Sequence, residues 1–397
     1  MIQKKKRYFW DLIFAIGVIT TTMTSLRIPG VPLGIGEILL AFWIIREWIP
    51  LIVTGNIKIR REKKNILMFW VLFFIILSVG MIFSSFKGRL LFKNAIYDLS
   101  AYLFSFILCL TLSIENKEES LYMKLKLIVV LGTLMFGFLL MWWKFIGPNF
   151  MGINIVYGGV RFAGGAINPN QLALFLVPVP GFALYFLNNK CGVNKLTRNM
   201  FFLFIFFTSI YIGISTGSDS LNATLLLTSV FFISVKIYRK FKFPYNIMCI
   251  LLILIIILLI ILLNAGIIDN MYTKGNKWFD ELDKDRSRAY LWIKGIKTAF
   301  ESPIVGFGPG AQILIYEANR VEVHNTFIDV LTQAGFLGLL SYLFLLLIIL
   351  KRIDDNIYLM CSFGSLLIFS IAHFTLRQPI FWIYLSLINI VHGRRTL

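Results

Sequence analysis

The chain has 397 residues, of which 58% are hydrophobic and 15% are charged, and its formal net charge is +19. Soluble domains carry about 25% charged and about 45–50% apolar residues, so this composition excludes an ordinary soluble protein. Apolar runs of about 20 residues, the length that spans a bilayer, recur along the sequence. They predict an all-α polytopic membrane protein in which residues 1–397 form one membrane domain.

Twelve apolar runs are candidate transmembrane helices. They cover residues 9–26, 31–53, 66–86, 96–114, 127–146, 170–187, 199–217, 219–235, 245–264, 324–350, 356–374 and 378–392. The second run is interrupted by Glu37, Arg46 and Glu47. The basic N-terminus resembles a signal peptide, but no small-residue cleavage site follows its apolar run. We therefore expect an uncleaved first span.

The basic residues favour one orientation of these spans. In the short loops, Lys and Arg are in excess on the side that holds the N-terminus, which predicts that both termini are cytoplasmic. The net positive charge then reflects topology and lipid contact, and we expect no nucleic-acid partner. The four cysteines show no disulfide or zinc-binding spacing and are interpreted as packing residues.

One long polar segment, residues 265–323, is predicted to be an exoplasmic loop. Its aromatic residues indicate that it folds against the membrane face. Its best helix is 286–301, which is amphipathic at about 100° per residue. Arg286 should face water with Lys294, Lys297 and Glu301, opposite Ala289, Trp292 and Ile296. Arg288 lies at the edge of the apolar side, so it should face the protein or the lipid interface, where snorkelling is the alternative to substrate binding.

Three predicted spans begin at the outer face with polar residues. One starts at Asn168-Pro169-Asn170 after Arg161, one at Ser218-Asp219-Ser220, and one at His324-Asn325. Helix N-termini bind anions, and Arg161, Arg288 and Arg377 could add full positive charges beside them. A pyrophosphate at the membrane surface would suit such a site. Ordinary helix capping is the alternative for Asn168 and Asp219.

His324 is the candidate catalytic residue, because an imidazole can take up a proton near neutral pH. A surface histidine at the end of a span is the alternative. His373 is a secondary candidate, whereas His392 at the C-terminus appears incidental. Asp283 and Asp285 have the spacing of a cation site, but nearby basic residues indicate a solvated charge run, so we expect no functional metal and no cofactor.

Several motifs together resemble the O-antigen ligase and polymerase family. They are Arg161…Asn168-Pro169-Asn170-x-Leu172-Ala173, Ser215-Thr216-Gly217-Ser218, Ser287-Arg288…Trp292, Pro303…Gly306-Phe307-Gly308, and His324-Asn325-Thr326-Phe327 followed by Gly335-x-x-Gly338. Each is weak, but their order and spacing are fairly specific over roughly residues 155–340. The flanking spans match only as generic hydrophobic helices.

The resemblance implies a helical, GT-C-like membrane glycosyltransferase. It would act at the outer face of the bacterial cytoplasmic membrane on glycans carried by undecaprenyl pyrophosphate, with inversion and without metal. By resemblance, Arg288 binds the donor pyrophosphate and His324 deprotonates the acceptor hydroxyl. The family often has an arginine where this chain has Asp219. Arg161, Arg377 or Arg286 would then have to replace it.

Three functions stay open at this point. The first is a polymerase that joins lipid-linked repeat units into a capsule, O-antigen or exopolysaccharide. The second is a ligase that transfers a finished glycan to a lipid, protein or wall acceptor. The third is a flippase for lipid-linked oligosaccharide, although two similar halves and broken mid-membrane helices, common in transporters, are not evident. Besides membrane lipid, a flippase and a chain-length regulator are the expected partners of a polymerase.

Overall fold

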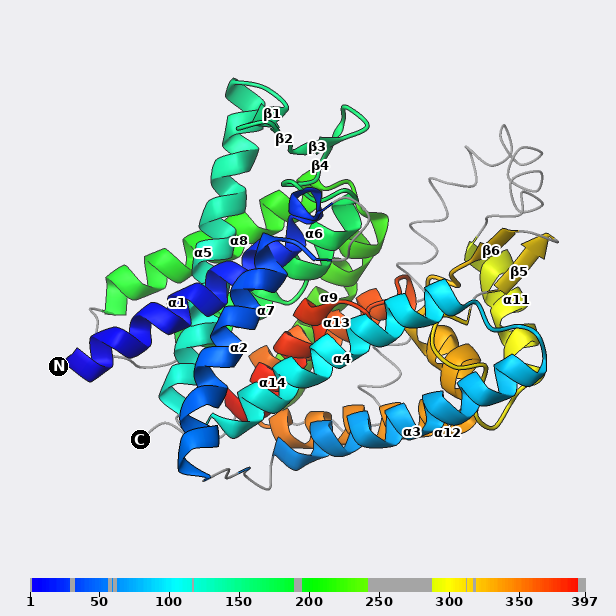
Figure 1. The fold of residues 1–397 in the computed structure, drawn as a ribbon. Coiled ribbons are helices and arrows are strands. Elements are labelled where there is room, and N and C mark those ends of the chain that lie inside the picture. The colour runs from blue at the N-terminus through cyan, green and yellow to red at the C-terminus, as the bar shows by residue number, and fades with distance from the viewer. Residues whose placement is uncertain are drawn as a thin grey trace, which may run out of the picture.

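The computed structural model describes residues 2–28, 33–55, 59, 63–115, 118–188, 195–241, 288–311, 313–316 and 319–391. The helices are α1 (Ile2–Thr22), η1 (Thr24–Leu26), α2 (Ile35–Thr54), α3 (Lys64–Phe86), α4 (Phe92–Ile114), α5 (Glu118–Phe145), α6 (Pro169–Leu176), α7 (Val179–Asn188), α8 (Lys195–Ser215), α9 (Asp219–Phe241), α11 (Arg288–Phe300), α12 (Thr326–Ile353), α13 (Ile357–Ile371) and α14 (Pro379–Val391). Figure 1 shows α3, α4 and α12 running beside one another, with α11 beyond one end of this group.

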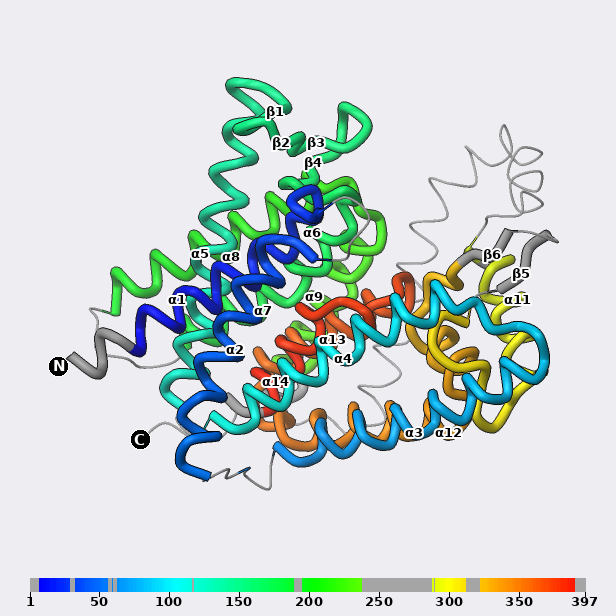
Figure 2. Tube along the Cα trace, viewed as in Figure 1, coloured from blue at the N-terminus to red at the C-terminus, as the bar shows by residue number. Residues whose placement is uncertain are grey.

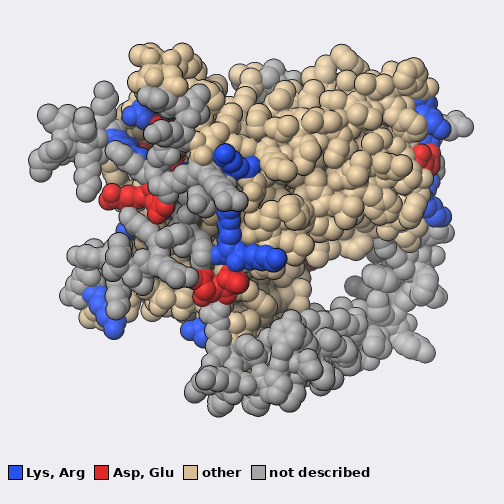
Figure 3. All heavy atoms as spheres, turned by 90° about the horizontal axis from the view of Figure 1, so that it is seen from below, with Lys and Arg blue, Asp and Glu red and all other residues tan. Residues whose placement is uncertain are grey.

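The predicted spans that lie within the described residues are helices, and the all-α polytopic membrane fold is confirmed. Within the described part of the chain, seven segments are long and apolar enough to cross a membrane: α3, α4, α5, α6 with α7, α8, α9 and α12. Helices α13 and α14 are apolar but shorter, and α1 and α2 coincide with the first two predicted spans. The predicted span 245–264 lies outside the described residues. On the face drawn in Figure 3, a broad surface without charged residues separates charged groups at its two sides.

Short antiparallel strand pairs, which the sequence did not predict, connect some of the helices. Between α5 and α6, β1 (Asn149–Phe150) pairs with β2 (Ile153–Asn154), and β3 (Val156–Tyr157) pairs with β4 (Arg161–Phe162). Between α11 and α12, β5 (Ile313–Tyr316) pairs with β6 (Asn319–Val321). The pair β3–β4 holds Arg161 at the C-terminal end of α8.

Aromatic side chains form the core where α3, α4, α12 and α14 meet. Trp70 and Trp382 are fully buried with ring centroids 4.4 Å apart, and Phe69 stacks on Trp382 at 5.4 Å. Aromatic pairs add about 0.5–1.5 kcal/mol beyond the area they bury. This cluster therefore fixes the helices that carry the outer polar residues.

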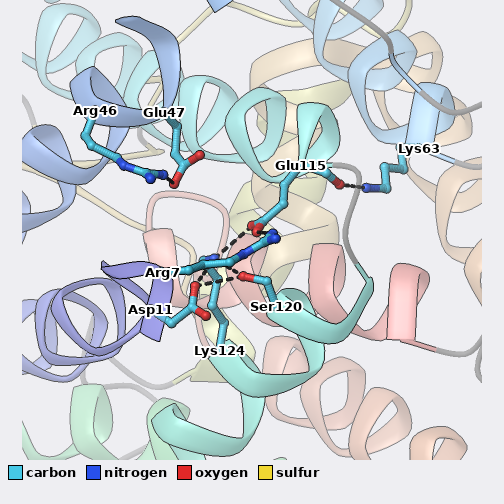
Figure 4. A network of polar contacts seen from close by, with 8 residues as sticks. All are labelled: Arg7, Asp11, Arg46, Glu47, Lys63, Glu115, Ser120 and Lys124. Carbon is cyan, nitrogen blue, oxygen red and sulfur yellow. Dashed lines mark hydrogen bonds and ion pairs between the residues drawn. The ribbon is translucent and has the colours of Figure 1, made fainter. Parts of the chain in front are cut away.

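A buried ion network joins α1 and α5 to the C-terminal end of α4 (Figure 4). Lys124 is fully buried, and its Nζ lies 2.5 Å from Asp11 Oδ1 and 2.8 Å from Glu115 Oε2. Arg7 Nη2 approaches the other Glu115 oxygen at 2.6 Å, and Lys63 Nζ donates to the Glu115 carbonyl. Buried charges are tolerated only when they are paired in this way.

A break in α12 positions α11 against the rest of the molecule. Gly335 has φ 62° and ψ −164°, a conformation open essentially only to glycine. Residues 303–308 fill the gap that the break leaves: their backbone makes four hydrogen bonds of 2.7–3.2 Å with residues 332–337. The tube in Figure 2 shows this loop returning from α11 towards α12. The two glycine motifs in the sequence therefore form one contact, because Gly306 lies directly against the backbone of Gln333.

Candidate active site

Two arginines flank the turn between α8 and α9. Arg161 Nε, from β4, donates to the carbonyl oxygen of Thr216 at 2.9 Å, and Arg288 Nη1, from the first turn of α11, donates to Ser220 Oγ at 3.0 Å. Gly217, at φ +59°, lets the Arg161 side chain lie against the turn, since a Cβ there would sit 3.2 Å from Arg161 Nε. The turn thus has a guanidinium group on either side.

These two arginines differ from the other cations of the site in their partners. Among the described residues, no carboxylate forms an ion pair with Arg161 or Arg288. Arg288 is exposed and Arg161 is half-buried, so both can still reach a ligand. Asp219 is exposed in the first turn of α9, directly after this turn, and it forms no ion pair with either arginine. Arg161, from another part of the chain, therefore lies against the turn that precedes Asp219, where it contacts Thr216 and Gly217.

Asn168 and Asn170 occupy the start of α6, as predicted. Asn168 Oδ1 accepts from the backbone N–H of Asn170 at 2.9 Å, with Pro169 at the first helical position, so Asn168 is an N-cap. Asn170 reaches further, because its Oδ1 accepts from Ser218 Oγ at 2.9 Å. Asn170 therefore joins the start of α6 to the α8–α9 turn.

His324 lies immediately before α12 in a left-handed conformation. Its φ is +56°, a region that non-glycine residues seldom adopt, and its side chain is exposed. Asn325 follows as the N-cap, and its side chain accepts from the N–H groups of Phe327 and Ile328 at 3.0 and 3.2 Å. Asn325 is 6% exposed, so its side chain is occupied in shaping the helix start that presents His324.

The surroundings of His324 favour the neutral imidazole. Loss of water around the ring lowers its pKa below the usual 6.5, the carboxylate of Glu322 acts in the opposite direction, and the cations Arg288 and Arg377 lower it further. A neutral imidazole at pH 7 is the form that can accept a proton.

His373 lies near this group but is enclosed. Its ring stacks on Phe369 with centroids 4.4 Å apart, and its Nε2 is buried without a hydrogen bond to the described residues. Burial, with the charges of Arg288 and His324, lowers its pKa to about 3. The carbonyl of His373 accepts from Thr326 Oγ1 at 2.6 Å, which ties the loop after α13 to the start of α12. The geometry thus gives His373 a supporting place.

Arg377 is held by two carboxylates rather than left open. Its Nη1 lies 3.1 Å from Asp98 Oδ1 and its Nη2 lies 2.5 Å from Glu322 Oε1, while its side chain is 17% exposed. Although burial disfavours the cation, Glu322 and Asp98 outweigh it and raise the pKa of Arg377. Arg377 therefore links α4 to the segment that ends in His324.

Sequence reasoning gave no role to either of these carboxylates, and it named Ser218 and Ser220 only as polar residues at the start of a span. Asp98 is 4% exposed within a predicted span, and its other oxygen accepts from the N–H of Gly310 at 3.0 Å. An ionisable residue inside an apolar run is itself a signal of function or pairing, and it could have identified Asp98. Nothing in the local sequence indicates that Ser220 meets Arg288.

Helix α11 confirms part of the predicted face pattern and corrects the rest. Arg288 faces the protein, as expected. The buried stripe, however, is Leu291 and Ala299, together with Gly295 against Val323, whereas Ile296 is 41% exposed. The reason is close packing, because a Cβ on Gly295 would lie only 2.8 Å from Val323. Arg286, Asp283 and Asp285 lie outside the described residues. Within the described residues there is no cluster of three or more His, Cys, Asp or Glu side chains that could hold a metal ion.

An apolar cavity of about 650 Å³ lies below the turn, between α7, α8, α9 and α13. Ile214 and Asn222 line it near the turn, and Phe232 and Ile233 line it further along α9. Eleven helical residues separate Asn222 from Ile233, which corresponds to about 16 Å at about 1.5 Å per residue. The cavity therefore runs from the arginine-flanked turn into the apolar part of the protein.

Comparison with known proteins identifies a family that is similar to part of this chain. Residues 204–343 match a family model described as O-antigen ligase, and this match covers the α8–α9 turn, α11 and His324. The chain is also 26% identical over 219 residues to the ComP-specific O-oligosaccharyltransferase of Acinetobacter baylyi. That alignment covers 52% of this chain and 38% of the relative, so the match spans less than half of the relative's length. The family resemblance predicted from the motifs is confirmed.

Proposed function

From the match of residues 204–343 to the O-antigen ligase family, we propose that this multi-pass membrane protein is a glycosyltransferase acting on lipid-linked glycans. The specific proposal is a polymerase that joins undecaprenyl-pyrophosphate-linked repeat units into a capsule, O-antigen or exopolysaccharide. The reaction is inverting, metal-independent and without cofactor. Its site lies on the exoplasmic face of the bacterial cytoplasmic membrane, with both termini cytoplasmic.

The observation that carries this proposal is the pairing of free cations with a neutral base. Arg161 and Arg288 contact one turn and have no carboxylate partner in the described chain, while burial and the charges of Arg288 and Arg377 lower the pKa of His324, which favours its neutral form. A guanidinium group donates two parallel hydrogen bonds to phosphate oxygens, which makes arginine suited to a pyrophosphate. In this arrangement Arg161 supplies the second cation, in place of the arginine that the family often has at the position of Asp219.

The transfer step follows from these positions. His324 takes the proton of an acceptor sugar hydroxyl, and that oxygen forms a new bond to the anomeric carbon of the donor glycan. The bond between that carbon and the pyrophosphate oxygen breaks, and the polyprenyl pyrophosphate leaves with the electron pair. Arg288 and Arg161 stabilise the charge that develops on the leaving group. Pyrophosphate is a good leaving group, so orientation and cationic stabilisation suffice for much of the catalysis.

The apolar cavity below the turn supports the same orientation of the donor. Its polar lining is confined to a few side chains such as Asn222 and Ser229, and it extends along α9 away from the arginines. A pyrophosphate at the turn would place the polyprenyl chain at the mouth of this cavity. Membrane lipid, a flippase that delivers the repeat units and a chain-length regulator are the proposed partners, and no nucleic acid is involved.

A ligase is the second candidate, and one observation favours it. The relative in Acinetobacter baylyi is named a transferase specific for ComP, so a similar chain uses a defined acceptor. The same donor site and base would serve a ligase, and only the acceptor would differ. A flippase is the alternative from another class, for which a histidine near two arginines that form no ion pair within the described residues has no evident purpose.

One reconstitution separates these functions. The purified protein is given polyprenyl-pyrophosphate oligosaccharides extracted from a host that lacks its gene, and glycan length is followed on a gel. A ladder of lengths is the result expected for a polymerase. Donor consumption only when a separate acceptor is supplied would identify a ligase. Movement of the lipid across a liposome bilayer without any transfer would overturn the enzyme proposal.

Two variants with matched controls test the named residues. His324→Ala should abolish the ladder, whereas His392→Ala, predicted to lie at the opposite membrane face, should not. Arg288→Lys should be severely impaired because the forked donor is lost. Arg89→Lys alters another arginine, which is 41% exposed and forms a surface pair with Glu301, and should leave the ladder unchanged. A normal ladder from His324→Ala would remove His324 as the base.

A further inference from the structure

A second cavity, of about 630 Å³, lies between α2, α4 and the start of α14. It is separate from the cavity below the α8–α9 turn, and it lies beside the catalytic segment, by which we mean residues 322–324. We name it the α4 groove. Its residues divide by chemistry along its length. The polar end lies at the outer end of α4 and is lined by Arg27, Glu37, Tyr97, Gln171, Arg377 and Gln378. The apolar end follows along α4 and is lined by Leu103, Phe104 and Ile107.

The α4 groove has the depth of one lipid leaflet. Tyr97 and Ile107 are ten helical residues apart, which corresponds to about 15 Å at about 1.5 Å per residue. The hydrocarbon core of a bilayer is about 30 Å thick, so the groove extends through about half of it. Leu103 and Ile107 are 44% and 38% exposed, which opens the apolar part towards lipid. An amphiphile could enter it sideways from the outer leaflet.

The polar end of the α4 groove offers both hydrogen-bond donors and acceptors. Arg27 is paired with Glu37 at 2.9 Å, and Arg377 is paired with Asp98 and Glu322. Each guanidinium has five N–H donors and uses only part of them in these pairs. The amide side chains of Gln171 and Gln378 and the ring of Tyr97, which lies beneath Arg377 at 5.6 Å, complete this end. Such a mixed lining fits sugar hydroxyls, which both donate and accept.

The balance of charge separates this groove from the donor site. Its arginines are already matched by carboxylates, whereas Arg161 and Arg288 have none in the described chain. The groove is nevertheless joined to the base, because Arg377 lines it and binds Glu322, two residues before His324. A head group in the groove therefore touches the same side chain that anchors the catalytic segment.

We propose that the α4 groove binds the acceptor, and that this acceptor is a lipid-anchored saccharide whose tail lies along Leu103, Phe104 and Ile107. This inference rests on the proposed glycosyl transfer and adds to it a second lipid-binding site. The donor and the acceptor then approach His324 from different sides, each held by its own lipid chain. A site of this kind suits a polymerase, or a ligase with a lipid acceptor, rather than transfer to a soluble protein.

Photocrosslinking at Phe104 tests this assignment. The full-length protein carries p-benzoylphenylalanine at Phe104 or, as a control, at Phe86, which is 88% exposed at the outer end of α3. The probe is radiolabelled polyprenyl-pyrophosphate oligosaccharide in liposomes. Strong labelling is expected at Phe104 only, and excess phosphatidylglycerol should not reduce it. Equal labelling at both positions, or competition by phosphatidylglycerol, would mean a general lipid groove and overturn the proposal.

Two further experiments are needed. The first tells an acceptor site from part of the donor site, and the second tells a failure of the groove assignment from a failure of the proposed function. Labelling at Phe104 should persist in Arg288→Lys, and its loss there would make the groove part of the donor site. Ala101→Trp, which fills the groove, should slow transfer at least tenfold at low substrate, whereas Val79→Trp on the lipid-facing side of α3 should not. If the wild type transfers glycan without labelling at Phe104, only the groove assignment fails. If the wild type transfers none, the proposed function fails.

Discussion

Replacing Gly335 with alanine tests whether the break in α12 holds the site together. At φ 62° and ψ −164° an alanine is strained, which costs about 1–3 kcal/mol. Its Cβ would also lie 2.3 Å from the backbone carbon of Ile304, an atom that no side-chain rotation can move. If α12 straightens instead, the four hydrogen bonds to residues 303–308 are lost, at about 1 kcal/mol each. We expect a loss of roughly 3–5 kcal/mol, which is large for one substitution.

The assay combines thermal unfolding in detergent with glycan transfer. For a chain of 397 residues, this loss corresponds to a fall in melting temperature of about 5 °C. Transfer should fall about 100-fold, because α11 and Arg288 shift relative to His324, and displacements near 1 Å have such effects. Gly364→Ala in α13 is the matched control, since its Cβ would meet nothing within 4 Å. A Gly335→Ala protein with unchanged melting temperature and transfer would refute this account of the break.

Five other predictions concern charged groups and metal dependence. Arg161→Lys should reduce transfer about tenfold by raising the KM for the donor, because a lysine cannot present the fork of N–H groups; an unaltered KM would argue against a donor role. Burial lowers the pKa of His324 below its usual 6.5, so kcat/KM should rise with pH, with the midpoint of the rise below pH 6.5, and should then level off. Glu322→Gln removes the carboxylate that raises this pKa, so the rise should move to lower pH, and a fixed rise would contradict that contact. Lys124→Met should cost about 3–5 kcal/mol of stability because it leaves Asp11 buried without a cation, measured as melting temperature, with part of the loss recovered in Lys124→Met/Asp11→Asn. Transfer should persist in EDTA, and a loss that Mg²⁺ or Mn²⁺ restores would point back to Asp283 and Asp285.

The spans were predictable because a bilayer imposes one simple requirement on each of them. A run of about 20 apolar residues has to form a helix, since backbone groups find no water in the hydrocarbon. The predicted starts at Asn168 and Asn325 were also confirmed as N-caps. There the signal is local, because the capping side chain bonds to N–H groups two or three residues along the chain.

The arrangement of the site depends on contacts that local patterns do not contain. Arg377 finds its partners 279 residues away at Asp98 and 55 residues away at Glu322, and Arg288 finds Ser220 at a separation of 68. Hydrophobic periodicity places each residue on a helix end but does not pair the ends with one another. Arg377 was predicted as a possible substrate-binding cation, and its observed ion pairs explain why Arg161 is the better candidate for binding the donor pyrophosphate.

The buried Lys124 network also bears on how the polypeptide enters the membrane during synthesis. A nascent chain that has produced only α1 carries Asp11 without its cation, which emerges 113 residues later. Because a buried carboxylate without its cation is costly, α1 can pack in its final position only once α5 has arrived. The amino-terminal helices therefore reach their final places together, and a ribosome stalled before residue 124 should leave α1 exposed to quality-control proteases.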